Sequence, residues 1–225
     1  MRQTTPAPLP KHYYLNNFRV LIDFVFQHYR PLLSSAESDF YTAFTALPDN
    51  CRQLYCRLLL RRGHFIRHSK IHYPEIASTA SALKLLTETG FIKPADPEQS
   101  AEWISLFSKS EIPPGLTGHT QPDDVSSQLC DQAPAPFNDR DLFGDSPLEL
   151  LTRHEPVYRV LHQETYLMYS LLFFGNLHQD LSEFVVTDLG FRHYEPYLTT
   201  TTALPFHSRD QLLAYWQYYL CSEAF

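Results

Sequence analysis

Apolar and aromatic residues recur every three or four positions in the first part of the chain, which is the spacing of an amphipathic helix. This pattern predicts a helix from Tyr13 to Tyr29, which Pro31 would end because proline cannot continue a helix. A second helix should end at Pro48, and a third should begin at Asp49 and run to Gly63.

Short extended segments follow these helices. Phe65–Arg67 and Phe91–Lys93 read as strands, and a helix should start at Pro74 and close at Gly90. Three helices, a strand, a helix and a second strand are typical of a winged-helix unit, provided that the two strands pair with each other.

The next stretch, from Pro94 to about Asp145, is polar and rich in proline. It leaves room for two short helices, Ala101–Lys109 and Asp123–Leu129. Stretches of this composition favour a linker over a packed core.

Regular patterns return after the linker. Ser146–Glu149 has the sequence of a capping box, a helix is expected from about Glu155 to Phe174, and Glu183–Leu189 reads as a strand. The region from Tyr194 to Thr202 looks extended. A last helix opens at Ser208 and carries aromatic side chains up to the end, so we expect the sequence to be part of a longer protein.

Composition favours the same reading. The 225 residues are 44% hydrophobic and 14% aromatic, enough for a real core, and 17 prolines against seven glycines disfavour a many-stranded fold. The fold class is therefore expected to be mainly α with minor β.

Charge is unevenly distributed. The net charge of −7 would argue against a nucleic-acid partner, but residues 1–74 carry ten Lys and Arg against four Asp and Glu. The remaining residues carry eight basic and 21 acidic side chains. Such asymmetry indicates a localised basic surface.

Cysteine usage and hydropathy argue against a secreted, disulfide-bonded protein and against a membrane protein. The four cysteines form no C-x-x-C pair, the N-terminus has no apolar leader, and the apolar run Leu167–Phe174 is too short to span a bilayer. We expect a soluble, reduced, intracellular protein without a membrane partner.

The main candidate site is the segment from Asn50 to Pro74. It holds six of the 18 basic side chains, three histidines and no acid, and Arg57 and Arg61 should share a helix face. Basic side chains on a rigid face neutralise phosphates independently of base sequence. The candidate DNA-binding residues are Arg52, Arg57, Arg61, Arg62, His64, Arg67 and Lys70. The alternatives are a solvated basic helix, or one that pairs with the acidic second half.

The sequence gives little support for a metal site. His64, His68 and His72 are spaced by four, but Gly63 and Pro74 should interrupt a helix there and no carboxylate lies among them. The run Asp139–Gly144 resembles the start of an EF-hand loop but lacks its later ligands.

Catalytic motifs are missing as well. The sequence contains no P-loop, dinucleotide-binding, nucleophile-elbow or H-E-x-x-H motif, and no E-x-K or D-x-K of metal-dependent nucleases. We expect no catalysis, no catalytic residues and no cofactor in this chain alone.

The segment Leu54–Ile76, LYCRLLLRRGHFIRHSKIHYPEI, closely resembles the Fanconi-associated nucleases, which are structure-specific DNA-repair nucleases with a C-terminal VRR-NUC domain. Tyr13–Phe18 is similar to the opening helix of that family, and Leu83–Ile92 to its next helix and turn. Leu172–Leu189 and His207–Tyr215 resemble the start of its helical-repeat region.

The resemblance implies a domain order. It consists of a leader (residues 1–11), a winged-helix-like DNA-binding domain (12–95), a SAP-like segment with an acidic linker (96–145), and the first helices of a TPR-like domain with a β insertion (146–225). The SAP-like segment keeps Trp103, Phe107 and Lys109, but its second helix would be acidic where such helices usually bind DNA.

The resemblance also implies a function. The family cuts 5′ flaps and branched or cross-linked DNA with Mg²⁺ or Mn²⁺, and its basic DNA-contacting positions match Arg57, Arg61 and Arg62, with Arg67 and Lys70 as neighbours. This chain would be the DNA-binding region, and its partners would be DNA and its own nuclease domain. It would lie in the bacterial cytoplasm at the nucleoid, or in a eukaryotic nucleus.

Two other functions and the oligomeric state stay open. The basic face could dock an acidic protein partner, or the chain could be a standalone, sequence-specific winged-helix regulator. Neither alternative requires the nuclease.

Overall fold

The computed structural model describes residues 11–96, 100–108, 110–112, 147–182, 184 and 204–223. The chain divides into two units. The first unit holds the residues up to Leu60 and from His162 onward, and the second runs from Arg61 to Leu161.

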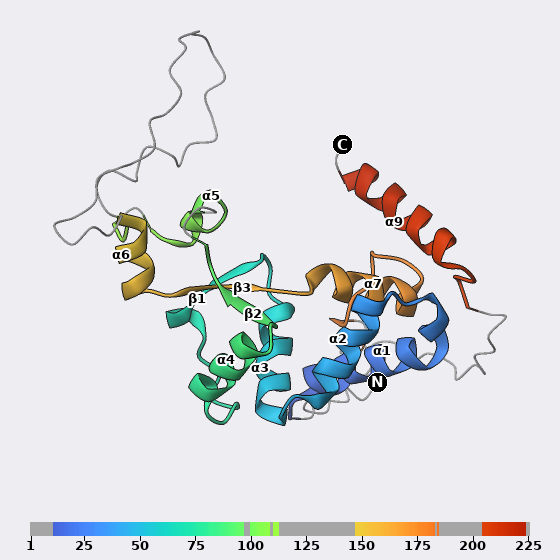
Figure 1. Ribbon diagram of the computed structural model, residues 1–225, viewed down its shortest axis with the longest axis horizontal. Helices are drawn as coiled ribbons and strands as arrows, with labels where there is room; N and C mark the ends of the chain where they lie inside the picture. Colours follow the sequence, from blue (N-terminus) through green and yellow to red (C-terminus); the bar gives the residue numbers. More distant parts are fainter. Residues whose placement is uncertain are drawn as a thin grey trace, which may run out of the picture. The chain divides into compact units, whose positions relative to one another are not determined.

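The first unit is helical (Figure 1). It begins with α1 (Tyr13–Tyr29), as expected from the apolar spacing, and a 3₁₀ turn (Arg30–Leu32) that contains Pro31. Then come α2 (Ser35–Ala46) and α3 (Asp49–Leu59), and, after the second unit, α7 (Gln163–Phe174) and α9 (Arg209–Glu223).

An aromatic core joins the helices of the first unit. The ring of Phe18 lies 5.0 Å from that of Phe44 and stacks on Tyr166 at 5.9 Å, so α1 packs between α2 and α7. Phe18, Phe44 and Tyr169 are each fully buried. Rings of this size exclude a large area from water and account for much of the unit's stability.

The second unit is built on a small antiparallel sheet of three strands in the order β1-β3-β2. The strands are β1 (Phe65–Arg67), β2 (Ile92–Pro94) and β3 (Val157–Val160). Helix α4 (Thr79–Glu88) packs against β2, while α5 (Ser100–Trp103) and α6 (Pro147–His154) are the other helices described here (Figure 1).

A hydrophobic cluster covers part of one face of this sheet. Trp103 is fully buried, and its indole N–H donates to the carbonyl of Asp96 at 3.0 Å. The other members are Ala95, Ile104, Phe107, Ile112, Leu151 and Val157, with Phe65 packed against them. The cluster fastens the segment around α5 to the strands.

The predicted pairing of the two early strands is wrong. Each of them pairs with β3, which lies between them, and β3 falls where the sequence pattern predicted the start of a helix from Glu155. The valines at both ends of Val157–Val160 are buried, so tertiary packing selected a strand over local helical spacing.

Other boundaries also differ. The helix expected from Pro74 begins at Thr79, and the helix expected over Ala101–Lys109 is one turn of α-helix followed by a 3₁₀ turn. The capping residue Ser146, the helix Asp123–Leu129, most of the strand from Glu183 and the extended region Tyr194–Thr202 lie outside the described residues. The chain is mainly helical with one small antiparallel sheet.

Candidate nucleic-acid interface

Helix α3 positions Arg52 and Arg57 in the first unit. Its apolar side, which includes Leu54, is buried, and this leaves the two arginines partly exposed. Arg52 donates to the carboxylate of Asp49 one turn earlier at 2.6 Å. The guanidinium of Arg57 lies 4.0 Å from the ring centroid of Tyr14, a cation–π contact that fixes its position.

Arg61 and Arg62 follow α3 but are not part of it. The helix ends at Leu59, and the amide of Leu60 bonds back to Cys56 and Leu58. The prediction that Arg57 and Arg61 share a helix face is therefore wrong.

The turn after α3 leaves its arginines in the second unit. Gly63, with φ of 87°, allows the left-handed turn there. Arg61 donates to the carbonyl of Lys70 at 3.2 Å and lies 5.3 Å from the ring centroid of Tyr73. Arg62 is exposed and makes no side-chain hydrogen bond or ion pair with any described residue.

Arg67 is held by carboxylates that are distant in sequence. Its two terminal nitrogens donate to the oxygens of Glu111 at 3.0 and 2.7 Å, and Nε lies 3.8 Å from Glu155. Hydrogen bonding to Arg67, with help from Ser108, lowers the pKa of Glu111 to about 2. The guanidinium also lies 4.3 Å from the ring centroid of Phe107. A contact of Arg67 with DNA stays a prediction, and sequence spacing gave no signal for these partners.

The histidines and Lys70 lie on the surface of the second unit. His64, His68, His72 and Lys70 are all exposed. In the described part of the chain, no group of three or more His, Cys, Asp or Glu side chains could hold a metal ion.

The strand register brings together two cations that sequence reasoning did not single out. Lys93 in β2 lies directly opposite Arg159 in β3, and Arg159 lies opposite Phe65 in β1. The β-branched valines at both ends of Val157–Val160 were the available signal, but the helix predicted from Glu155 obscured it.

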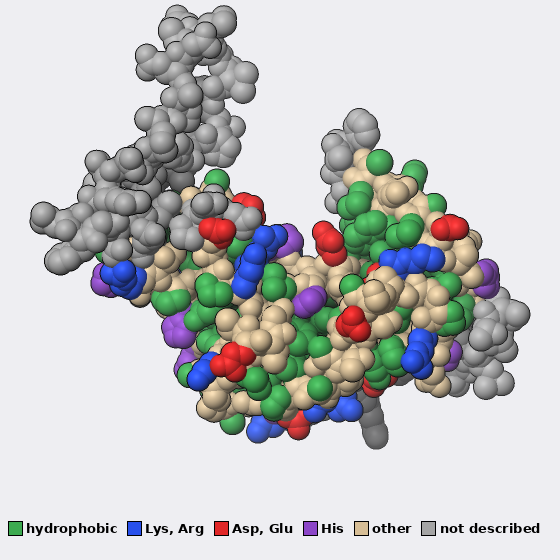
Figure 2. Space-filling model, in the orientation of Figure 1, with side chains coloured by type: hydrophobic (Ala, Val, Ile, Leu, Met, Phe, Trp, Pro, Cys, Tyr) green, Lys and Arg blue, Asp and Glu red, His purple; other side chains and the backbone are tan. Residues whose placement is uncertain are grey.

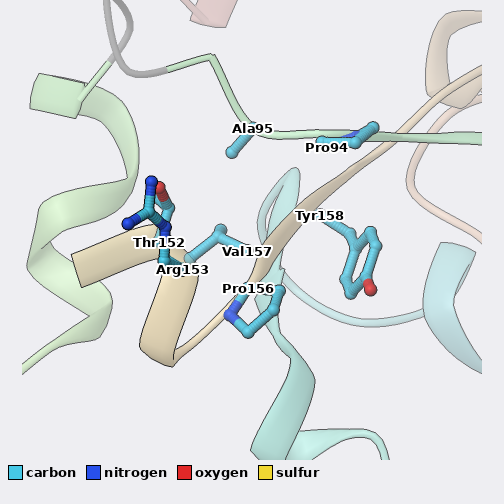
Figure 3. A pocket seen from close by; sticks show the side chains of 7 residues that line it. All are labelled: Pro94, Ala95, Thr152, Arg153, Pro156, Val157 and Tyr158. Carbon is cyan, nitrogen blue, oxygen red and sulfur yellow. The ribbon is translucent and has the colours of Figure 1, made fainter. Parts of the chain in front are cut away.

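An open pocket of about 350 Å³ lies beside the ends of these strands (Figure 3). Its lining is largely apolar, and Arg153 is its charged member. The residues around it are Pro94, Ala95, Thr152, Arg153, Pro156, Val157 and Tyr158. Among these lining residues, no nucleophile is paired with a general base.

Basic side chains occur in several small groups on the face shown in Figure 2. None of the described helices is long and apolar enough to cross a membrane.

Comparison with known proteins assigns the chain. Residues 12–93 match the family described as "FAN1, HTH domain". The chain is a FAN1 homologue. It is 28% identical over its whole length to the Fanconi-associated nuclease 1 homolog of Pseudomonas aeruginosa and 31% identical over 90% of its length to that of Arabidopsis thaliana.

The structural comparison gives the same assignment. The chain matches the crystal structure of paFAN1 bound to DNA with a 2-nt 5′ flap and a gap, with a TM-score of 0.72 and 26% identity over 98% of the chain. The chain spans 41% of the Pseudomonas relative and 24% of the Arabidopsis relative. It therefore corresponds to a portion of a FAN1 protein that includes the HTH domain.

Proposed function

We propose that this chain is the DNA-holding portion of a structure-specific DNA-repair nuclease, and that it grips flapped or branched DNA through its phosphates. The observation that supports this most is the match of nearly the whole chain to paFAN1 bound to 5′-flap DNA. A winged-helix-like domain, a SAP-like segment and the first helices of a repeat domain are part of the proposal.

Arg61 and Arg62 are the leading phosphate ligands. Both are exposed, and the contacts of Arg61 with Lys70 and Tyr73 pre-orient its guanidinium, which lowers the entropy lost on binding. Arg57, which lies over Tyr14, is a third. Arg52, His64, Arg67 and Lys70 are the further candidates.

The cutting step would belong to another part of the protein. Hydrolysis of 5′ flaps, 5′ exonuclease activity and cross-link repair would need a VRR-NUC domain with Mg²⁺ or Mn²⁺. These 225 residues do not contain the motif of such a nuclease domain. The role of these 225 residues would be to hold and orient the DNA, at the nucleoid of a bacterium or in the nucleus of a eukaryote.

Binding of a fluorescent 5′-flap DNA, followed by anisotropy over a series of salt concentrations, tests the proposal. Four or five phosphate contacts give a slope of log affinity against log salt of roughly −4. Arg61→Gln with Arg62→Gln should weaken binding equally for flaps of different sequence, and Arg57→Gln should weaken it further. Lys84→Gln, on the exposed side of α4, is the matched control.

Two results would contradict the proposal. Unchanged affinity of the Arg61→Gln, Arg62→Gln protein would show that these side chains do not meet phosphates. A strong preference for one duplex sequence would instead support a sequence-specific regulator.

A further inference from the structure

A row of three residues crosses the sheet of the second unit, with Phe65 and Lys93 on either side of Arg159. Neighbouring backbone bonds establish the geometry. Leu161 N–H donates to the carbonyl of Phe91, and Ala95 N–H to that of Val157. Because hydrogen-bonded pairs alternate along an antiparallel ladder, Lys93 and Arg159 form such a pair, with Cα atoms about 5.5 Å apart.

Phe65 and Arg159 form the other kind of pair. The bonds from Val160 N–H to the His64 carbonyl and from His68 N–H to the Pro156 carbonyl flank them. Side chains of such a non-hydrogen-bonded pair lie closer together, and the Arg159 guanidinium is 5.6 Å from the Phe65 ring centroid. Directly opposed residues project from the same face, so both cations and the ring share one surface.

The apolar packing of this face ends one row away. Ala95, two positions after Lys93, and Val157, two positions before Arg159, are buried in the cluster around Trp103. Lys93 is exposed and Arg159 is half-buried. The two cations therefore lie at the rim of the cluster.

Charge explains why this row would attract an anion. Two cations on one surface raise the local positive potential, which favours a bound anion. On the adjacent row, Arg67 already binds the carboxylates of Glu111 and Glu155. Lys93 has no ion pair with any residue that the structure describes.

We propose that Lys93 and Arg159, with Phe65 orienting the guanidinium, form a phosphate-binding site for the nucleic-acid backbone. This site rests on the proposed function and is additional to the arginines that follow α3. A guanidinium beside an ammonium offers several charged donors to the oxygens of one or two phosphates. The contact is independent of base sequence, as befits a protein that recognises DNA structure.

Three variants test the site with the same 5′-flap DNA and salt series. Lys93→Gln and Arg159→Gln should each make the slope of log affinity against log salt shallower by about 0.9, and the double variant by about 1.8, with a tenfold or greater loss of affinity at low salt. Lys84→Gln, which removes an exposed cation paired with Glu88 on α4, should leave slope and affinity unchanged.

The thermal unfolding midpoint of each variant serves as the control for correct folding. Because Lys93 is exposed, Lys93→Gln should leave the midpoint unchanged, whereas Arg159→Gln also removes the contact of the guanidinium with the Phe65 ring and should lower it slightly. Arg159→Lys keeps the charge and should retain most of the affinity.

The outcomes separate this site from the proposed function. If the unchanged protein does not bind flap DNA, both are wrong. If Arg61→Gln with Arg62→Gln weakens binding but a folded Lys93→Gln, Arg159→Gln protein binds as tightly as before, only this site is overturned. The assignment to nucleic acid also fails if the double variant loses binding to inorganic phosphate or polyglutamate while its affinity for DNA is unchanged.

Discussion

Arg67 and Glu111 form a two-point ion pair across 44 positions of sequence, with N–O distances of 3.0 and 2.7 Å. The pair connects strand β1 to the segment that contains Trp103 and Phe107, and Glu155 joins it from two residues before β3. An arginine that composition marks as a phosphate ligand therefore also organises the second unit.

Neutralising either partner of this pair should loosen the segment 100–112. Arg67→Gln and Glu111→Gln each remove one charge of the pair, and Glu111→Gln also keeps the side-chain length, so both should increase amide hydrogen exchange around Trp103. Hydrogen exchange with mass spectrometry measures the effect. Unchanged protection in Glu111→Gln would show that the apolar cluster alone holds the segment.

Acid should loosen the same segment. Because the pKa of Glu111 in the folded protein is about 2, below its ordinary 4.5, the stabilisation is present above pH 4.5 and is lost as pH falls toward 2. In a Trp216→Phe background, the emission of Trp103 should shift to the red over that range. Adding Glu111→Gln should remove this part of the pH dependence, and a persistent shift would assign it to other carboxylates.

The first unit has a comparable pair in Glu37 and Arg209. The two terminal nitrogens of Arg209 donate to the carboxylate oxygens of Glu37 at 2.6 and 2.9 Å. Glu37 is buried, and its carboxylate also caps α2 by accepting from the Ser34 N–H at 2.7 Å. Glu37→Gln can keep the cap but lose the ion pair, and should cost about 2 kcal/mol of unfolding free energy. Chemical denaturation measures this.

Two further variants assign that cost. Glu37→Ala loses both cap and ion pair, and should cost about 1 kcal/mol more than Glu37→Gln. Arg209→Gln should match Glu37→Gln. A much smaller loss for Arg209→Gln would mean that water replaces the guanidinium, which is 31% exposed.

The strand order can be tested by cross-linking. Ile66 lies opposite Tyr158, and paired Cα atoms in a ladder are about 5.5 Å apart or less, within disulfide range. A protein with Ile66→Cys and Tyr158→Cys, in a background with Cys130 and Cys221 replaced by serine, should form a disulfide detectable by mass spectrometry. Ile66→Cys with Ile92→Cys should not, because β3 separates the two strands by roughly 9.5 Å. The reverse result would restore the predicted direct pairing.

Local signals were enough for much of the helical part. The spacing of Phe18, Leu21, Ile22 and Val25, with Pro31 after it, predicted α1 with its observed bounds. Phe65–Arg67 was also expected as a strand, and the strand expected over Phe91–Lys93 lies one residue later, at Ile92–Pro94. These elements are determined by residues within a turn or two of one another.

The candidate site depends on the local sequence and on the tertiary structure. The sequence by itself determined a basic, acid-free segment that contains Arg61 and Arg62, and the structure shows that both are exposed. Only the tertiary structure decided that Arg67 binds Glu111, that β3 separates β1 from β2, and that Arg159 faces Lys93. Helical periodicity is a local property, whereas ion pairs and strand neighbours depend on which distant segments the burial of Trp103 and Val157 brings together.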